Sequence, residues 1–160
     1  MKRRPMGTPT LALLSGLLAG CGGGNGTSAP PAAPAGTLHV AGTYTIARSY
    51  VSNTCDPEIP GATTTVTGTV THAPGGSQFT LANSDGGNFN ARIEADGTFT
   101  SGVQSRIGVN GESYDLLFEG RFAVQGFRAT VAVDLFRAGG ACRSVLDWEA
   151  TKQGAPNVIP

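Results

Sequence analysis

Few side chains in this 160-residue sequence could carry out acid–base or metal chemistry. The sequence has two histidines, His39 and His72, and neither has cysteines or carboxylates nearby at the spacing of a metal site. Alternation of polar and apolar residues places His39 on a polar face and His72 at a strand end. We therefore expect His39 to be a solvated histidine rather than a metal ligand.

Two carboxylate pairs could in principle hydrolyse a glycosidic bond, a reaction that needs two acidic side chains flanking the substrate. Asp147 and Glu149 share one face of a predicted strand, and Glu94 and Asp96 flank a predicted turn. Carboxylates two residues apart on an outward face are normally only solvated, so neither pair predicts catalysis.

Asn83, Asp85 and Asn88 surround two glycines and offer the oxygen atoms that calcium prefers. Hairpin turns favour the same residue types, so the sequence indicates a turn here. The sequence shows no serine on a strand-turn-helix elbow, which a serine nucleophile would need. It also shows no glycine loop before a helix that could bind phosphate. We therefore predict that the protein is not an enzyme and has no cofactor and no metal site.

The amino-terminal residues have the pattern of an export signal. A basic start, an apolar run over 11–18 and small residues before a cysteine predict a secretory signal over residues 1–20. Leu18-Ala19-Gly20-Cys21 resembles the lipobox of bacterial lipoproteins. The resemblance implies that Cys21 is acylated and anchors the protein to a lipid bilayer. Because Gly22 and not aspartate follows it, the resemblance implies the outer membrane of the cell envelope.

Two further cysteines, Cys55 and Cys142, form an even pair in an exported chain, where oxidation is permitted. We predict a disulfide between them.

Composition separates a tether from a folded domain. Residues 21–36 are rich in glycine, proline and alanine and contain no large apolar side chain, which predicts a disordered spacer. Residues 153–160 are predicted to be a flexible tail.

Removal of three basic residues with the signal leaves 8 basic against 11 acidic residues, a net charge of −3. A weakly acidic chain without a basic stripe does not predict nucleic-acid binding.

Residues 37–152 show the two-residue alternation of β-strands, and no helical period persists for three turns. Tight-turn signals separate the strands: Ser84 to Gly87, Asp96-Gly97, Asn110-Gly111 and Gly139-Gly140. We predict eight strands, at about 37–50, 62–72, 79–81, 89–93, 99–109, 114–122, 127–135 and 142–150.

The strand faces predict a core. In the fifth strand, Phe99, Val103, Ile107 and Val109 share one parity and are expected to face inward. Trp148, the only tryptophan, is expected in the core of the last strand.

Short connections favour antiparallel neighbours, so the fold class predicted is all-β, an eight-stranded up-and-down barrel; the alternative is a β-sandwich. The cysteines favour the barrel. Cys55 follows the first strand and Cys142 opens the last, so pairing of these strands brings both sulfurs to one end. Closure also removes exposed strand edges.

Gly42-Thr43-Tyr44 on the first strand and Trp148 on the last look like features of calycin barrels, such as lipocalins and avidins. A wider pattern resembles a group of uncharacterised bacterial lipoproteins. It consists of the first-strand element, Cys55, segments 65–70 and 96–99, and Cys142. The calycin resemblance implies a small barrel, and the lipoprotein resemblance implies no particular activity.

Two functions are compatible with these features. The first is a non-enzymatic binding or structural module that contacts a small ligand, a glycan or an envelope protein. The second is a proteinaceous inhibitor of a cell-wall enzyme such as lysozyme, because Asn110-Gly111-Glu112-Ser113-Tyr114 is similar to part of a loop in lipoprotein-type lysozyme inhibitors. That resemblance makes Asn110, Gly111 and Tyr114 candidate interaction residues.

Overall fold

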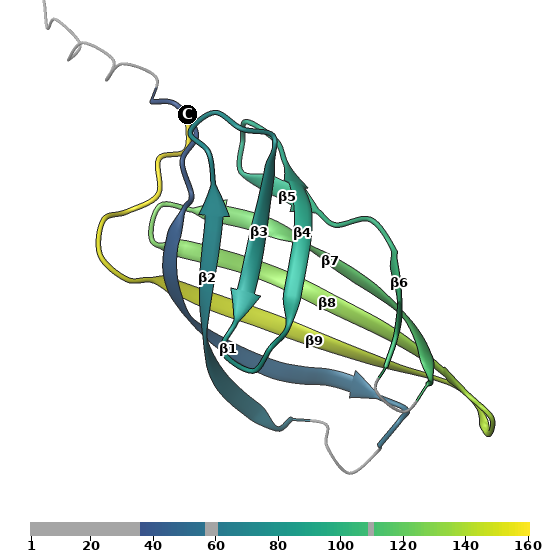
Figure 1. The fold of residues 1–160 in the computed structure, drawn as a ribbon. Helices are drawn as coiled ribbons and strands as arrows, with labels where there is room; N and C mark the ends of the chain where they lie inside the picture. The colour runs from purple at the N-terminus through teal and green to yellow at the C-terminus, as the bar shows by residue number, and fades with distance from the viewer. Residues whose placement is uncertain (1–35, 57–60, 109–110) are drawn as a thin grey trace, which may run out of the picture. The chain divides into compact units, whose positions relative to one another are not determined.

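The computed structural model describes residues 36–56, 61–108 and 111–160, and the fold below refers to these residues. Nine strands make up the fold (Figure 1): β1 Gly42–Asn53, β2 Thr63–His72, β3 Gln78–Asn83, β4 Asn88–Ile93, β5 Thr98–Thr100, β6 Gln104–Ile107, β7 Ser113–Ala123, β8 Gly126–Arg137 and β9 Gly140–Lys152. Cys21, the predicted signal and most of the predicted tether lie outside the described residues.

The strands close into an antiparallel barrel of eight strands with one extra strand, which confirms the predicted fold class over the β-sandwich. The wall follows chain order from β1 to β5, continues through β7, β8 and β9, and returns to β1. The extra strand, β6, pairs only with β7. A closed wall leaves no long unpaired edge of the kind that promotes aggregation.

The seam between the first and last strands forms as predicted. β1 pairs antiparallel with β9, and Ile46 lies opposite Ala150. Cys55 and Cys142 form a disulfide with their Cα atoms 5.0 Å apart. The bridge therefore fastens the two strands at the end of the barrel where β1 finishes and β9 begins.

Alternation along each strand fills the interior with aromatic rings. Trp148 is only 4% exposed, which confirms its predicted place in the core. Gly120 is required opposite Phe99, because a Cβ at that glycine would lie 2.8 Å from the Phe99 ring and even closer to backbone. Most rings meet at centroid distances of about 5–6 Å in tilted or edge-to-face geometry. The buried aromatic residues are Tyr44, Phe79, Phe89, Phe99, Phe118, Phe122, Phe127 and Trp148.

The predicted fifth strand is wrong as a single element. The structure divides it into β5 and β6, because the chain leaves the barrel wall at residues 101–103, where Gly102 adopts a φ of +60°. This break shifts the alternation, so Val103 and Ile107 are 68% and 78% exposed instead of facing inward. Val109 lies outside the described residues.

The last residues close one end of the barrel, in contrast to the expected flexible tail. Asn157 is buried, and its side-chain amide donates to the carbonyls of Ala123 and Gly126. Val158 forms a β-bridge with His39, and Ile159 packs against the core. The sequence of this segment hides its role, because its two prolines and its glycine are typical of a flexible end, whereas Asn157, Val158 and Ile159 all contact the barrel.

Candidate functional site: the open end of the barrel

Strand lengths make the two ends of the barrel unlike. β1, β7, β8 and β9 have 11 to 13 residues, whereas β3, β4 and β5 have three to six. The long strands therefore extend beyond the short ones at the end opposite Asn157, and we call that end the open end. Four core side chains are only partly buried there: Val66, Tyr114, Val133 and Leu146.

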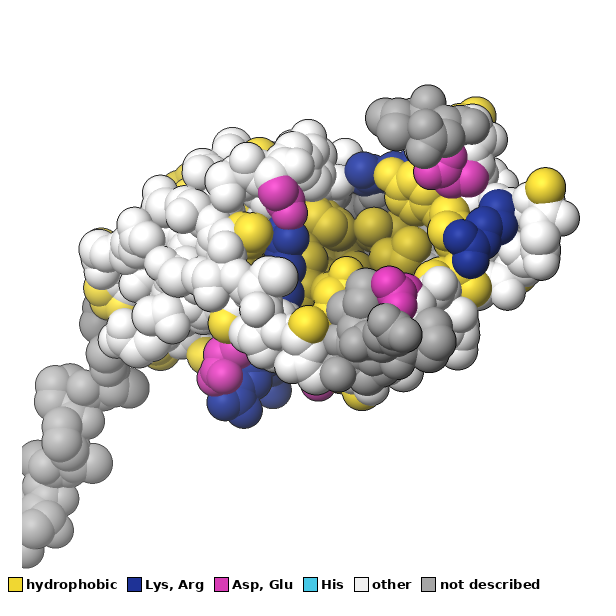
Figure 2. Space-filling view, turned by 90° about the horizontal axis from the view of Figure 1, so that it is seen from below, with side chains coloured by type: hydrophobic (Ala, Val, Ile, Leu, Met, Phe, Trp, Pro, Cys, Tyr) yellow, Lys and Arg dark blue, Asp and Glu magenta, His cyan; other side chains and the backbone are white. Residues whose placement is uncertain are grey.

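Figure 2 views the molecule from this side and shows a hollow with hydrophobic side chains inside it and charged side chains of both signs around it. The inward positions of β7, β8 and β9 supply its long wall, because Leu116 lies opposite Val133 and Val131 lies opposite Leu146. The floor is the packed core, where Phe118 is fully buried. The open end is thus an apolar concavity above a solid interior.

An ion pair connects the β3–β4 turn to β1 at this end of the barrel. Asp85 in the turn accepts a hydrogen bond from Nη1 of Arg48 in β1. The Arg48 side chain is 12% exposed, and its guanidinium carbon lies 4.4 Å from the centroid of the Trp148 ring. The bond from Arg48 lowers the pKa of Asp85 below its usual range, so the Asp85 carboxylate is charged at neutral pH. The Trp148 ring stabilises the guanidinium of Arg48 through a cation–π contact, in a part of the wall that is otherwise apolar.

Four buried side-chain atoms in the described part of the chain lack a hydrogen-bond partner: Arg48 Nε, Asn83 Nδ2, Asn83 Oδ1 and Trp148 Nε1. Trp148 contacts both Arg48 and Phe89. Asn83 Nδ2 and the edge of the Phe89 ring border the same space beside Gly87. Each unpartnered buried group destabilises a fold by about 1–3 kcal/mol, so three side chains of this kind together need an explanation.

Gly68 makes the space that Asn83 occupies. A Cβ at residue 68 would lie 2.9 Å from Asn83 Oδ1 and 2.6 Å from the side chain of Ile46. The Asn83 amide is therefore inside the barrel and 7% exposed, although it ends a strand that leads into a polar turn.

A second arginine spans a gap in the wall beside the hollow. Nη2 of Arg106 in β6 donates to the backbone carbonyl of Asn88 in β4 and to Gln104 Oε1, at 2.6 and 2.7 Å. Gln104 Nε2 donates to the carbonyl of Asn90 at 2.8 Å. Side chains thus replace the missing backbone ladder between β4 and β6. The partners of Arg106 in the described structure are neutral, so its positive charge is not balanced by a contact.

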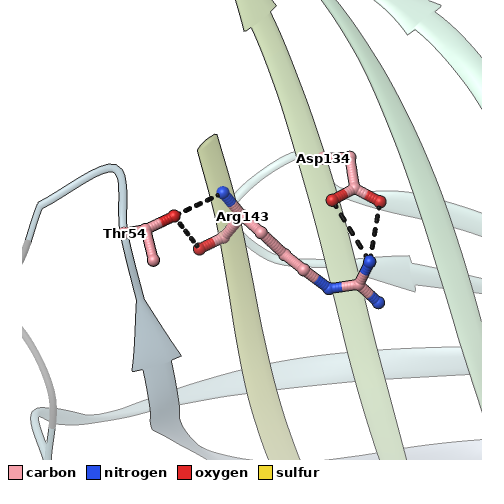
Figure 3. A network of polar contacts seen from close by, with 3 residues as sticks. All are labelled: Thr54, Asp134 and Arg143. Carbon is pink, nitrogen blue, oxygen red and sulfur yellow. Dashed lines mark hydrogen bonds and ion pairs between the residues drawn. The ribbon is translucent and has the colours of Figure 1, made fainter. Parts of the chain in front are cut away.

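The rim next to the disulfide is held by a polar network (Figure 3). The Thr54 hydroxyl accepts a hydrogen bond from the Arg143 backbone amide at 2.8 Å and lies 3.1 Å from the Arg143 carbonyl, to which it donates. Arg143 Nη1 contacts both carboxylate oxygens of Asp134 at 3.1 and 3.3 Å. These contacts, with the neighbouring Cys55–Cys142 bridge, fix this side of the opening.

The closed end has a different polar cluster, and its groups have partners. The Tyr44 hydroxyl lies 2.6 Å from the Val40 carbonyl and 2.7 Å from Asn157 Oδ1. Burial raises the pKa of Tyr44 far above its usual range. Lys152 Nζ donates to Asn157 Oδ1 and lies 5.8 Å from the Tyr44 ring, and burial lowers the pKa of this lysine. This end is a structural plug.

The structure places the predicted interaction residues at the open end only in part. Tyr114 is half-buried in the wall of the hollow, and Gly111 lies in the turn before β7 with a φ of +83°. Asn110 lies outside the described residues.

The other candidate residues lie at structural or surface positions in the part of the chain that the structure describes. His72 is buried and bonded through its ring to backbone at Val40 and Gly76, and the ring of His39 lies 6.3 Å away. Glu149 pairs with Arg128 on the exposed face of the barrel. No group of three potential metal-ligating side chains occurs among the residues that the structure describes.

The sequence predictions missed Arg48 and Asn83 as functional candidates. Their signal was present: Arg48 continues the inward parity of Tyr44 and Ile46, and Asn83 continues that of Phe79 and Leu81. A polar side chain at an inward position of a barrel strand is the feature that would have found both.

No protein-family model matches this chain, and no curated protein or solved structure is significantly similar to it. The described residues include no helix that is long and apolar enough to span a membrane.

Proposed function

We propose that this protein is a lipid-anchored protein of the bacterial cell envelope whose barrel binds a small amphiphilic molecule at its open end without chemical turnover. The observation that carries the proposal is the hollow at the open end, which has hydrophobic side chains inside it and charged side chains of both signs around it. Ligand sites commonly combine an apolar concavity with a few converging polar groups. A ligand with both characters would bury its apolar part in the hollow and keep its polar part at the charged rim.

The anchor rests on the lipobox-like Leu18-Ala19-Gly20-Cys21. A glycine- and proline-rich spacer after it would keep the barrel near the membrane, most simply the outer membrane. Amphiphilic molecules concentrate in that environment, which fits the apolar character of the hollow.

The anchor is tested with Cys21→Ser in cells supplied with a radiolabelled fatty acid. We expect the label in the wild-type protein and none in the variant, because the acylated sulfur is absent. Wild-type protein that takes up no label, or equal labelling of the variant, contradicts the lipoprotein assignment.

The binding site is tested by blocking the hollow in the isolated domain, residues 36–160, which contains all nine strands, the core and the disulfide. Val133→Trp should place a large ring in the hollow. We expect this variant to bind neither a polarity-sensitive fluorescent probe nor the neutral amphiphiles that displace the probe from the wild type. Ile107→Trp is the matched control, because Ile107 is 78% exposed. Equal binding by both variants would exclude this hollow as the site.

Inhibition of a cell-wall enzyme is the second candidate. A shallow groove of about 730 Å³ runs beside the turn before β7, lined by Gly111, Glu112 and Ser113 with the hairpin that joins β8 and β9. Phe136 lines the same groove and is 42% exposed, so an aromatic contact is offered to a protein surface. A lysozyme-inhibition assay with Phe136→Ala as the variant tests this candidate, and full activity of lysozyme with excess wild-type domain would exclude it for that enzyme.

A further inference from the structure

We propose that the outer wall of the barrel carries a second binding site, for a sugar that bears a carboxylate, as in a uronic acid. The site is a groove of about 350 Å³ between the outward faces of β3 and β4 and the segment that leads from β5 to β6 (Figure 1). Small-molecule sites typically measure about 300–1,000 Å³, so the groove fits a ligand of about one sugar ring. It shares no lining residue with the hollow at the open end and does not depend on the proposed function.

Strand register brings the polar side chains of the groove together. Thr71 lies opposite Thr80, and Thr80 lies opposite Asn90, so three strands contribute to one row. Gln78 lies opposite Arg92 in the next row. Neighbouring strands are about 4.8 Å apart and residues on one face of a strand about 6.8 Å apart, so these five positions cover about 10 by 7 Å.

The segment that leads to β6 forms a fixed side of the groove. The Ser101 amide donates to the Phe118 carbonyl at 2.8 Å, and the Ser101 hydroxyl accepts a hydrogen bond from the Phe118 amide at 2.9 Å. Gln104 Nε2 donates to the Asn90 carbonyl at 2.8 Å, and Gln104 Oε1 accepts from Arg106 at 2.7 Å. Because these groups are held in place before a ligand binds, less conformational entropy is lost on binding.

The charges around the groove favour an anion. Arg92 lines the groove, and Arg106 contacts Gln104 at its side. Neither arginine takes part in an ion pair in the part of the chain that the structure describes, whereas four other arginines do. The described lining residues include no carboxylate, and Glu94 lines an adjoining hollow with Arg92 without pairing with it. Arginine binds a carboxylate through two parallel hydrogen bonds, so a ligand carboxylate would balance this charge.

The uncharged side chains favour a ligand with several hydroxyl groups. Thr71, Gln78, Thr80 and Asn90 are exposed, and their side chains form no hydrogen bond with other described residues. Two hydroxyls and two amides offer both donors and acceptors. Sugar hydroxyls also do both, whereas a phosphate ion mainly accepts and would leave the acceptors of the groove without donors. A sugar acid therefore matches the groove better than an inorganic anion or a neutral sugar.

The test compares three forms of one sugar: methyl galactopyranosiduronate, its methyl ester and methyl galactopyranoside. Only the first carries a charged carboxylate at neutral pH. Chemical-shift changes in NMR spectra of the isotope-labelled domain, residues 36–160, report the affinity, and the amides of segments 78–80, 90–92 and 101–104 report the place of binding. We expect the uronate to bind about tenfold more tightly than either neutral form, because a hydrogen bond to a charged group contributes about that factor or more.

Two further ligands identify the source of the sugar acid. Trigalacturonate that shifts the same segments and binds more tightly than free galacturonate indicates a residue of an acidic polysaccharide. Equal affinities of the two indicate a free sugar acid. Inorganic phosphate is the competing anion, and we expect it to bind more weakly than the uronate.

Arg92→Gln separates the charge from the shape of the groove. The side chain is exposed, so the fold should be unchanged, and the variant should bind the uronate and the neutral forms with equal affinity. Arg128→Gln is the matched control, because this arginine is 82% exposed on β8, outside the groove, and the variant should retain the preference for the uronate.

Thr80→Val keeps the shape of the side chain and removes its hydroxyl. We expect this variant to bind all three sugars more weakly by a similar factor, because the hydroxyl is assigned to the ring and not to the carboxylate. Thr65→Val, on the exposed face of β2 outside the groove, is the control and should bind as the wild type does.

Four results would overturn the inference: no sugar shifts these segments, the three sugars bind equally, phosphate binds more tightly than the uronate, or Arg92→Gln keeps the preference. None of them affects the proposed function, which is measured at the open end with Val133→Trp.

Discussion

Replacement of Trp148 by alanine tests the packing of the barrel most directly. The indole is 4% exposed and lies between the guanidinium of Arg48 and the rings of Phe89 and Phe118, whose centroids are 5.2 and 5.5 Å from its own. Trp148→Ala removes the largest side chain of the last strand at the seam. It also leaves Arg48 inside the barrel without the ring that it covers.

The size of the loss follows from these contacts. Truncation of a buried aromatic residue to alanine costs about 3–5 kcal/mol, including the cavity left behind. A desolvated cation–π contact contributes about 2 kcal/mol and overlaps partly with that figure, so we expect a total of about 4–5 kcal/mol. For a domain of this length, each kcal/mol lowers Tm by about 4 °C, which predicts a decrease of about 15–20 °C.

Circular dichroism with thermal and denaturant unfolding of the domain measures the loss, and the native fluorescence of the wild type reports the environment of the single tryptophan. Ile107→Ala is the control, because a residue that is 78% exposed should change the stability by no more than about 0.5 kcal/mol. A loss below about 1 kcal/mol for Trp148→Ala, or red-shifted native emission with ready iodide quenching, would refute the packing described here.

Two further predictions concern the seam and the β3–β4 turn. The domain should contain no free thiol after denaturation, and two titratable thiols in exported protein would contradict this. Reduction of the Cys55–Cys142 bridge should remove about 4–5 kcal/mol of stability, because the bridge closes a loop with a sequence separation of 87 residues. Asp85 has a lowered pKa in the folded state because of its bond to Arg48, so its stabilising effect should be fully present above the ordinary aspartate pKa of about 3.9 and be lost as the pH falls through the lower folded value. Denaturant unfolding from pH 7 to pH 2 should therefore show wild type and Asp85→Asn converging in stability only at the acid end, whereas a constant difference at every pH would exclude the ion pair as its source.

The order of the barrel strands could be predicted from sequence because short turns force neighbours in the chain to be neighbours in the wall. The cysteines then specified the seam, since Cys55 and Cys142 flank the two strands that had to meet. The break between β5 and β6 could not be predicted in the same way. Val103 and Ile107 continue the apolar alternation of Phe99, and only the turn at Gly102 reverses the face that they present.

The candidate site was predictable only in outline. Inward parity alone marks Arg48 as unusual, but a buried arginine could equally be satisfied by a carboxylate, and Asp85 does engage one of its nitrogens. That Nε, the indole nitrogen of Trp148 and the amide of Asn83 have no partners depends on the positions of several strands at once. Such information is contained in the tertiary packing and not in any local pattern.

The bridge between His39 and Val158 places both ends of the described domain at the closed end of the barrel. Gly36 lies beside Val158 as well, so the described domain begins and ends at one pole (Figure 1). The hollow lies at the other pole (Figure 2). This makes the barrel a module that can be attached or inserted without obstructing its opening. A fluorescent protein fused after Pro160, or the whole domain grafted into a loop of another protein, should leave ligand access unchanged. A circular permutant that joins the two ends with a short linker should do the same.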